Sequence, residues 1–192
     1  MITTRKQLLD VLRRDAKANG RTTTRPSFFG DEIWKFQIAL RKLEYYSNIS
    51  PVKRTLVYPA YALTKYRYHN MSIKLNFSIP INVFGEGLAL PHYGTIVVAK
   101  AARIGKNCRI HEGVTIGATN GSSSAATIGD NVFIASGAKI IGGITIADNV
   151  AIAANAVVIK SITEAGTTWG GVPAKKISDK DSRSNLSKKL FE

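Results

Sequence analysis

The most regular feature of the chain is an aliphatic residue at every sixth position between residues 98 and 158. Ten of the eleven positions on this step are Ile or Val, and the residue that follows each of them is mostly Gly or Ala. The positions are Val98, Ile104, Ile110, Ile116, Ser122, Ile128, Ile134, Ile140, Ile146, Ile152 and Val158. An α-helix repeats about every 3.6 residues and a strand about every two, so neither produces this period.

A six-residue period is typical of a parallel β-helix, in which each hexad forms a short strand and a corner. Three hexads close one triangular coil, and the aliphatic side chain points inward because only stacked coils can bury it. The sequence therefore predicts a mainly β fold. Ser122, the one polar residue on the step, lies in a run rich in Gly, Asn and Ser. That composition predicts a loop extruded from the coils at residues 117–127.

Residues before position 74 show helical spacing instead. Apolar residues recur at intervals of three and four in segments 4–18, 31–46 and 51–68, and the third segment is interrupted at Pro59. Thr4 and Gln7 have the spacing of a capping box, Gly20 is expected to end the first helix, and Asp31 is expected to cap the second.

Four residues of this helical part carry individual expectations. Trp34 and Phe36 are expected in the core, because aromatic residues that bind nucleic acid usually lie on basic exposed surfaces. Asp15 and Arg14 are expected to be surface charges. None of the helices resembles a recognition helix with a preceding turn, so no nucleic-acid partner is expected.

The composition changes near Lys74, where Gly and β-branched residues replace the helical stripe. We therefore predict a helical region at 1–73, a β-helix domain at 74–177, and a tail at 178–192 that is either a short helix or frayed. Phe84, Leu90 and Ile96 also follow a six-residue step, but two residues out of phase with Val98. A slip of two residues is thus predicted between Ile96 and Val98, and such irregularities often lie beside functional residues.

The net charge of +14 is unevenly distributed. Residues 1–74 carry 15 Lys and Arg against 5 Asp and Glu, whereas residues 75–192 carry 12 against 8. The basic half predicts either an ordinary solvated helix face or contact with an anionic glycan or membrane surface. The chain has one cysteine, no signal-like apolar core near its start and no apolar run that could span a bilayer. We therefore expect a cytoplasmic protein, free or at the inner membrane face.

One histidine stands out against the repeat. His92 lies between Pro91 and Gly94, close to the slip. A corner histidine on the surface is the ordinary interpretation, but a neutral imidazole is also the usual base for the proton of a hydroxyl. Glu112 follows His92 by 20 residues, which equals one 18-residue coil plus the slip of two. Together with His111, it is expected to lie one coil from His92 and to orient it or pair with it.

A second distinctive segment closes the repeat at residues 170–176, with the sequence Gly-Gly-Val-Pro-Ala-Lys-Lys. Its glycines allow a ligand close to the backbone and its lysines offer charges for phosphate, although a plain capping turn is the alternative. With the hexads, the interrupting loop and the segment 85–98 around His92, this segment resembles the hexapeptide-repeat acyltransferases. Within that family, the chain is similar to the serine acetyltransferase branch and to its relatives in bacterial capsule and exopolysaccharide loci.

The resemblance implies a left-handed parallel β-helix with an N-terminal α-helical extension, a homotrimer, and acetyl transfer from acetyl-CoA to a hydroxyl. His92 matches the family's catalytic base. No metal is expected, because His69 lies in the helical part and only two other histidines remain. The residues implied to hold acetyl-CoA are Gly117, Ala118 and Thr119 at the loop, Ala135, Ser136, Ala153 and Ala154 along the pantetheine arm, and Lys175 and Lys176 near the phosphates. His111 and Glu112, which the spacing places one coil from His92, are expected as acceptor-side or supporting residues.

Departures from the serine acetyltransferase pattern bear on the acceptor. Those enzymes have an Asp directly before the catalytic His, where this chain has Pro91, and an orienting Asp about a coil earlier, where it has Phe77. They bind the serine carboxylate with an Arg-His pair, and this chain has Ser-Ala-Ala at the matching residues 124–126. We therefore expect the acceptor to be a hydroxyl of a sugar or polysaccharide precursor. The alternatives are serine O-acetylation, as in cysteine biosynthesis, and a non-catalytic trimeric scaffold.

Overall fold

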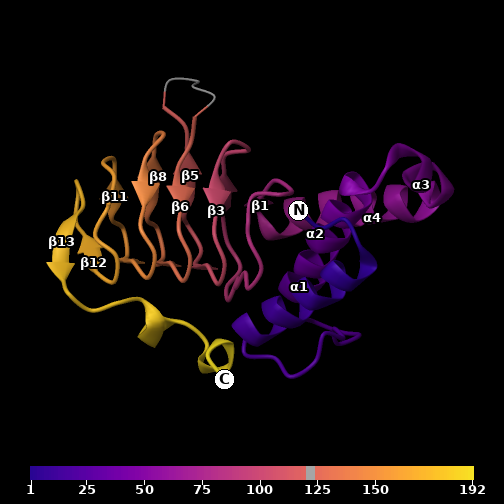
Figure 1. Cartoon of the computed structure of the whole chain (residues 1–192), viewed down its shortest axis with the longest axis horizontal. Helices are drawn as coiled ribbons and strands as arrows, with labels where there is room; N and C mark the ends of the chain where they lie inside the picture. The colour runs from indigo at the N-terminus through magenta and orange to yellow at the C-terminus, as the bar shows by residue number, and fades with distance from the viewer. Residues whose placement is uncertain (120–123) are drawn as a thin grey trace.

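The computed structural model describes residues 1–119 and 124–192 of the 192-residue chain. The α-helices lie at one end of the molecule, and short strands stack in coils toward the other end (Figure 1). The helices are α1 (Arg5–Ala18), α2 (Glu32–Asn48), α3 (Pro51–Leu56) and α4 (Tyr58–Leu75). No helix in this described part is long and apolar enough to cross a membrane.

The strands build the three faces of a prism. The first face contains β1 (Phe77–Ser78), β2 (Ile96–Val98), β5 (Thr115–Gly117), β8 (Lys139–Ile141) and β11 (Val157–Val158). The second contains β4 (Arg109–Ile110), β7 (Phe133–Ile134), β10 (Ala151–Ile152), β12 (Thr168–Gly170) and β13 (Lys175–Ser178), and the third contains β3 (Arg103–Ile104), β6 (Thr127–Ile128) and β9 (Thr145–Ile146). Neighbouring strands pair in parallel except β12 and β13, which are antiparallel. The predicted parallel β-helix with an N-terminal helical extension is confirmed.

The strand register explains why the repeat survives its interruption. An uninterrupted coil takes 18 residues, so Val98 pairs with Ile116, and Ile128 pairs with Ile146. Across the predicted loop, Ile116 instead pairs with Ile140, 24 residues later. The six additional residues equal one hexad, and the aliphatic step therefore resumes in phase. Residues 120–123, which include Ser122, lie outside the described part of the chain.

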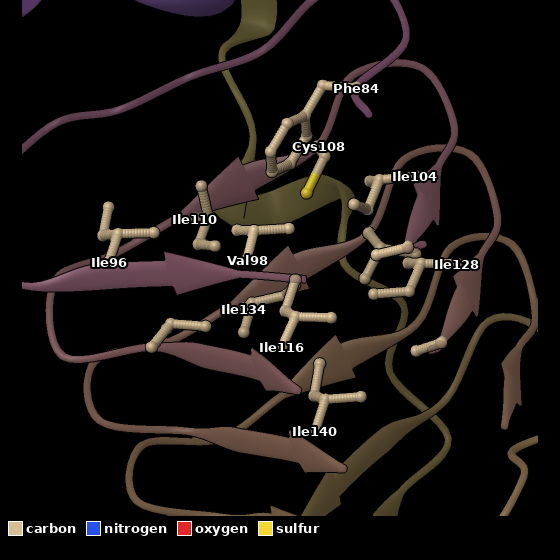
Figure 2. Close-up of a cluster of buried hydrophobic side chains, with 14 of the residues drawn as sticks. Phe84, Ile96, Val98, Ile104, Cys108, Ile110, Ile116, Ile128, Ile134 and Ile140 are labelled. Atoms are coloured by element: carbon tan, nitrogen blue, oxygen red, sulfur yellow. The ribbon is translucent and has the colours of Figure 1, made fainter. Parts of the chain in front are cut away.

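The aliphatic residues of the six-residue step fill the inside of the prism (Figure 2). Ile110, Ile116 and Ile134 are completely buried, and each contributes about 1.5–3 kcal/mol relative to an exposed side chain. Cys108 lies among them beside Phe84 (Figure 2). Burial raises the pKa of its thiol to about 12, so this cysteine fills the core rather than acting as a nucleophile.

A ladder of asparagines supports one corner of the coils. The Asn107 side chain donates to Asn131 at 2.7 Å, and Asn131 donates to Asn149 at 3.0 Å. Their φ angles of 56°, 56° and 59° lie in the left-handed region, which asparagine tolerates better than most residues. Arg14 of α1 donates its Nε to the Asn107 Oδ1 at 3.0 Å. This half-buried arginine is therefore not the simple surface charge predicted from the sequence.

Local signals set the helix ends. The Thr4–Gln7 capping box is present at the start of α1, as predicted. Asp31 precedes α2, but its side chain does not cap the helix. Its carboxylate instead accepts two hydrogen bonds from Arg21, at 2.8 and 2.7 Å, and this contact lowers the pKa of Asp31 to about 2. Trp34 and Phe36 are buried, as expected.

The C-terminal segment is packed rather than frayed. It forms the short helices η1 (Arg183–Asn185) and η2 (Lys188–Leu190) and runs back from β13 along the coils toward α1 (Figure 1). Leu186 and Leu190 are buried against Ala18 and Ala89. The tail therefore contacts both the helical part and the first coil.

A buried cluster of charges joins the helices to the first coil. Arg41 of α2 is almost fully buried, and its Nε lies 2.7 Å from the carboxylate of Asp15 in α1. Its guanidinium also donates to Glu44 at 3.0 Å and to the carbonyls of Phe84 and Gly85 at 2.9 and 2.5 Å. Burial alone would disfavour the charge, but the two carboxylates outweigh it and raise the pKa of Arg41.

Asp15 shows why this cluster was missed in the sequence. It was expected at the surface, yet it is completely buried. Besides Arg41, it accepts the backbone N–H groups of Gly87 and Leu88 at 2.7 and 2.9 Å. A carboxylate with three partners in the fold can be buried, and those partners are more than 25 residues away in sequence.

The substitution Arg41→Met tests this cluster. It leaves two carboxylates buried without their cation, and we expect a loss of about 3–5 kcal/mol in the free energy of unfolding. Chemical denaturation followed by circular dichroism measures the change. The neighbouring exposed residue provides a control, because Lys42→Met should change stability by less than about 0.5 kcal/mol. Equal stability of the two variants would show that the cluster does not join the two parts.

Candidate active site

His92 lies on a corner of the first coil that is two residues longer than the corner above it. Ala89 pairs with Arg109, and the N–H of Gly113 donates to the carbonyl of Thr95. On the first coil, the chain takes six residue steps from Ala89 to Thr95. On the next coil, it takes only four steps from Arg109 to Gly113. The slip is therefore at this corner, not between Ile96 and Val98 as predicted. The additional residues move His92 outward from the regular path of the chain.

Three ionisable side chains meet at this corner. A ring nitrogen of His92, a ring nitrogen of His111 and a carboxylate oxygen of Glu112 all lie within 4.8 Å of one another. The two imidazole rings meet edge to face, with their centroids 5.2 Å apart, and the opposite side of His111 rests on Phe133 at 5.1 Å. The structure thus places His111 and Glu112 one coil from His92, as the 20-residue separation predicted. Gly94 makes this possible, since a Cβ at this position would lie 2.9 Å from the Cβ of Glu112.

Hydrogen bonds define the state of His111. The Nε of Arg109 donates to its Nε2 at 3.3 Å, so this nitrogen carries no proton. The ring proton is then on Nδ1, which faces the hydroxyl of Ser136 at 3.5 Å. Burial, followed by the positive charge of Arg109, lowers the pKa of His111. His111 is therefore a neutral ring that holds a proton on the side of Ser136.

The carboxylate of Glu112 completes the network. The hydroxyl of Ser136, then its own backbone N–H, and after these the nearby imidazoles of His92 and His111 lower its pKa, so it is an anion at neutral pH. Its Oε2 is buried without a hydrogen-bond partner among the described residues. Ser136 was predicted only to line a pantetheine groove, and sequence reasoning missed its contact with both supporting residues.

The same three side chains have the composition of a metal site. Two imidazoles and a carboxylate can bind a transition metal. However, the guanidinium of Arg109 already occupies the Nε2 of His111, and its positive charge opposes a second cation at the same place. The arrangement suits proton transfer better than metal binding.

The other predicted site residues lie along two edges of the prism. Ala135 directly follows β7 and Ala153 directly follows β10, so both stack in line with His111, which follows β4. The next residues, Ser136 and Ala154, stack in the same way in line with Glu112. Gly117 instead ends β5, and Ala118 and Thr119 follow this strand at another corner. A single chain therefore does not bring the two sets together.

The two lysines near the end of the repeat differ in their contacts. The Nζ of Lys176 lies 2.5 Å from Glu164 and 2.6 Å from Asp179. The hydrogen bond to Asp179, followed by that to Glu164, raises the pKa of Lys176. Lys175 is exposed, and it has no ion pair within the described part of the chain. Both lysines line a hollow of about 430 Å³ with Trp169 and Lys160. Lys175 is thus freer than Lys176 to meet a phosphate.

A larger cavity, not predicted from the sequence, adjoins the His92 corner. Its volume is about 530 Å³. Pro91 and Tyr93, the neighbours of His92, line it, as does Arg109. The rest of its wall comes from the end of α1, the connector to α2, α2 itself, the first coil and the C-terminal segment. It includes Ala18, Asn19, Gly20, Arg21, Asp31, Ile33, Trp34, Gln37, Ala89, Leu90 and Ser187.

Two polar atoms in the wall of this cavity lack partners among the described residues. They are the Nε of Arg21 and the Oε1 of Gln37, whose side chain is 1% exposed. The amide of Gln37 is fixed in orientation, because its Nε2 donates to the carbonyl of Leu88 at 2.8 Å. A buried acceptor without a partner costs about 1–3 kcal/mol, which a hydroxyl of a bound molecule would offset. A glutamine on the apolar face of a helix was the available sequence signal.

Comparison with known proteins supports the fold and narrows the class. Residues 125–160 match the family described as bacterial transferase hexapeptide (six repeats). A serine acetyltransferase from Brucella abortus strain S19 superposes with a TM-score of 0.72 and 26% identity, covering 93% of this chain and 72% of that one. A serine acetyltransferase of Neisseria gonorrhoeae in complex with serine superposes with a TM-score of 0.65 and 26% identity, over 91% of this chain and 70% of that one. The chain is therefore a left-handed parallel β-helix protein built from hexapeptide repeats.

The similarity in sequence is more local. A serine acetyltransferase of Staphylococcus xylosus is 43% identical over 62 residues, which cover 31% of this chain and 29% of that protein. A second one, from Synechococcus elongatus, is 36% identical over 62 residues, or 31% of this chain and 25% of that protein. The chain thus spans less than a third of these curated relatives. None of these relatives is a capsule or exopolysaccharide enzyme, and that part of the expected resemblance is not supported.

The substitution Glu112→Gln tests the electrostatic coupling at the corner. The carboxylate favours the charged form of the His111 imidazole, so its removal should lower the pH at which His111 loses its proton. Titration of the imidazole protons by NMR measures the midpoint. Asp10→Asn, on the exposed face of α1, is the control and should leave the midpoint unchanged. An unchanged midpoint of His111 in Glu112→Gln would mean that the carboxylate does not act on this imidazole.

Proposed function

We propose that the protein is an acetyl-CoA-dependent O-acetyltransferase, with His92 as the general base. The observation that carries this proposal is the cluster at the enlarged corner, where an exposed imidazole lies beside an anionic carboxylate and a neutral second imidazole. The similar proteins are serine acetyltransferases, and one structural neighbour, at 23% identity, is described as a complex with CoA. The protein would use acetyl-CoA as co-substrate and no metal.

The reaction needs two proton transfers, one from the acceptor hydroxyl to His92 and one from His92 to the leaving thiolate. His92 takes the proton of the acceptor hydroxyl as the oxygen attacks the thioester carbonyl, and the C–S bond then breaks. The imidazolium returns the proton to the departing thiolate of CoA. Glu112 stabilises the imidazolium by charge, and His111 with Ser136 holds Glu112 in place. A backbone N–H of Gly117 or Ala118, from a neighbouring copy in a homotrimer, is the proposed donor to the oxyanion, worth about 10²–10³ in rate.

Serine is the acceptor that the comparisons favour. The reported relatives are serine acetyltransferases, and one solved neighbour is in complex with serine. This supports the serine alternative of the sequence analysis better than its preferred sugar acceptor. The assignment requires another way to hold a carboxylate, because Ala125 and Ala126 are buried and uncharged where the serine acetyltransferase pattern has an Arg-His pair. Arg109, which lines the cavity and contacts His111, is the proposed candidate.

A sugar hydroxyl is the second candidate, and the cavity beside His92 favours it. Its volume of about 530 Å³ falls in the usual range of about 300–1,000 Å³ for small-molecule sites. Its wall combines the Trp34 ring with unpaired polar atoms of Gln37 and Arg21, which suits a ring carrying several hydroxyls. This candidate extends the expectation from sequence but does not have the support of the comparisons.

Replacement of the base tests the reaction itself. His92→Ala should lower the release of CoA thiol in the presence of a mixed pool of amino-acid and sugar acceptors by about 10²–10⁴. His69→Ala, an exposed histidine on α4, is the matched control and should retain the wild-type rate. Retention of the full rate by His92→Ala would overturn the assignment. If the wild type binds acetyl-CoA, the ligand at about 100 times its Kd should raise the free energy of unfolding by about 2.7 kcal/mol. A wild-type protein that shows neither turnover nor this stabilisation would support the alternative of a non-catalytic scaffold.

A substitution in the cavity wall separates the two acceptors. Gln37→Leu removes the unpaired acceptor, and the Leu88 carbonyl keeps its other hydrogen bond, from Asn19 at 2.9 Å. If a sugar is the acceptor, its KM should rise by about tenfold while the KM for acetyl-CoA stays constant, because one hydrogen bond is worth about 1–1.5 kcal/mol. Mass spectrometry of the acetylated products identifies the acceptor. A preference for serine with no effect of Gln37→Leu would exclude the cavity as the acceptor site.

A further inference from the structure

The segment that contains α3 and α4 has no acidic residue. No Asp or Glu occurs between Glu44 and Glu86, whereas five basic residues do: Lys53, Arg54, Lys65, Arg67 and Lys74. In Figure 1, α3 and the start of α4 lie at the end of the molecule farthest from β13. Lys74, at the end of α4 nearest the coils, lies 3.9 Å from Glu32. The other four basic residues lie on a segment that has no acidic side chain of its own.

The inner face of α4 explains how it is held. Tyr61, Thr64, Tyr68, Met71 and Leu75 recur at intervals of three and four, which places them along one side of the helix. Tyr68 stacks on Phe36 of α2 with ring centroids 5.6 Å apart, and Met71 packs against the main core. This side is the contact of α4 with the rest of the protein.

The opposite side of α4 is also apolar, but it is exposed. Leu63, Tyr66 and Ile73 are separated by three and seven residues, so they share one side, which we call the outer face. They are 49%, 64% and 64% exposed. Lys65 lies along one edge of this outer face, and Arg67 lies along the other. Apolar side chains with a basic side chain on either edge are typical of a helix that lies in a membrane interface.

The short helix α3 extends the exposed apolar surface. Val52 is 74% exposed and Leu56 is 79% exposed, and Lys53 lies between them in sequence. No residue of α3 is buried, so the helix has no packing role of its own. Exposed apolar side chains in this number usually mark a site of interaction.

We propose that α3 and the outer face of α4 bind the surface of an anionic phospholipid bilayer. Charge complementarity selects this occupant. A second copy that docked by the same face would bring two purely basic surfaces together, and such contact is repulsive without acidic partners. Anionic lipid headgroups instead pair with the lysines and arginines, while the apolar stripe enters the acyl boundary. The proposal does not depend on the acetyl-transfer reaction.

Co-sedimentation of the full chain with lipid vesicles tests this inference. The protein should bind vesicles of phosphatidylcholine mixed with phosphatidylglycerol, and not vesicles of phosphatidylcholine alone. The double variant Lys53→Glu/Lys65→Glu should lower the partition coefficient by at least about 30-fold, since each basic residue near the surface contributes roughly fivefold. The control Lys100→Glu/Lys180→Glu has the same net charge, with its exposed substitutions in the β-helix and near the C-terminus, and should bind like the wild type.

A second variant separates docking from simple attraction to charge. Leu63→Ser/Tyr66→Ser keeps every charge and should also weaken binding, because it removes the apolar stripe. Equal binding by all variants, or no binding of the wild type at low salt, would overturn the proposal. A change in oligomeric state in the Leu63→Ser/Tyr66→Ser variant, measured by sedimentation velocity, would show instead that a second copy covers the face.

Discussion

The burial of Arg41 is the constraint on which the arrangement of the two parts depends. A guanidinium removed from water must find a partner for each of its donors, and the partners here come from three places: α1, α2 and the first coil. Such a cluster adds little net stability compared with an apolar replacement, because desolvation offsets most of its attraction. Its effect is on geometry, since the donors of Arg41 reach the carbonyls of Phe84 and Gly85 only while α2 keeps its present position on the first coil. The helical part is therefore fixed in position, not merely attached.

The position of α2 in turn determines what lies beside His92. Gln37 precedes Arg41 by about one helical turn, and it bonds the carbonyl of Leu88, which Asn19 of α1 also bonds. The peptide that carries Leu88 leads directly into the enlarged corner. Movement of α2 would thus change the cavity wall and the base of that corner together. The helices thus form much of the wall of the cavity that adjoins this corner.

The sequence predicted the features that depend on local spacing. The six-residue step identified the coils, and the 20-residue separation of His92 and Glu112 placed them together, because stacking in a β-helix converts sequence distance into spatial distance. The sequence did not predict the burial of Asp15, because its partners are in α2 and the first coil. It also did not predict the role of Gln37, which resembles an ordinary polar residue on a helix. The predicted place of the slip was also wrong. Ile96 and Val98 are both buried, and the change of phase between them does not show which neighbouring corner holds the additional residues.

The carboxylate at the corner shows how one arrangement can replace another. The family resemblance expects an orienting Asp about one coil before the histidine, but Phe77 at that position is buried in the core and contacts Phe36. A charge there would lack partners and be costly to bury. The anionic side chain instead comes from the following coil, where Glu112 is partly exposed and accepts a hydrogen bond from Ser136. Gly94 leaves the space that Glu112 needs, and the two additional residues of the corner bring His92 to it. The longer corner and the relocated carboxylate are therefore one structural change rather than two.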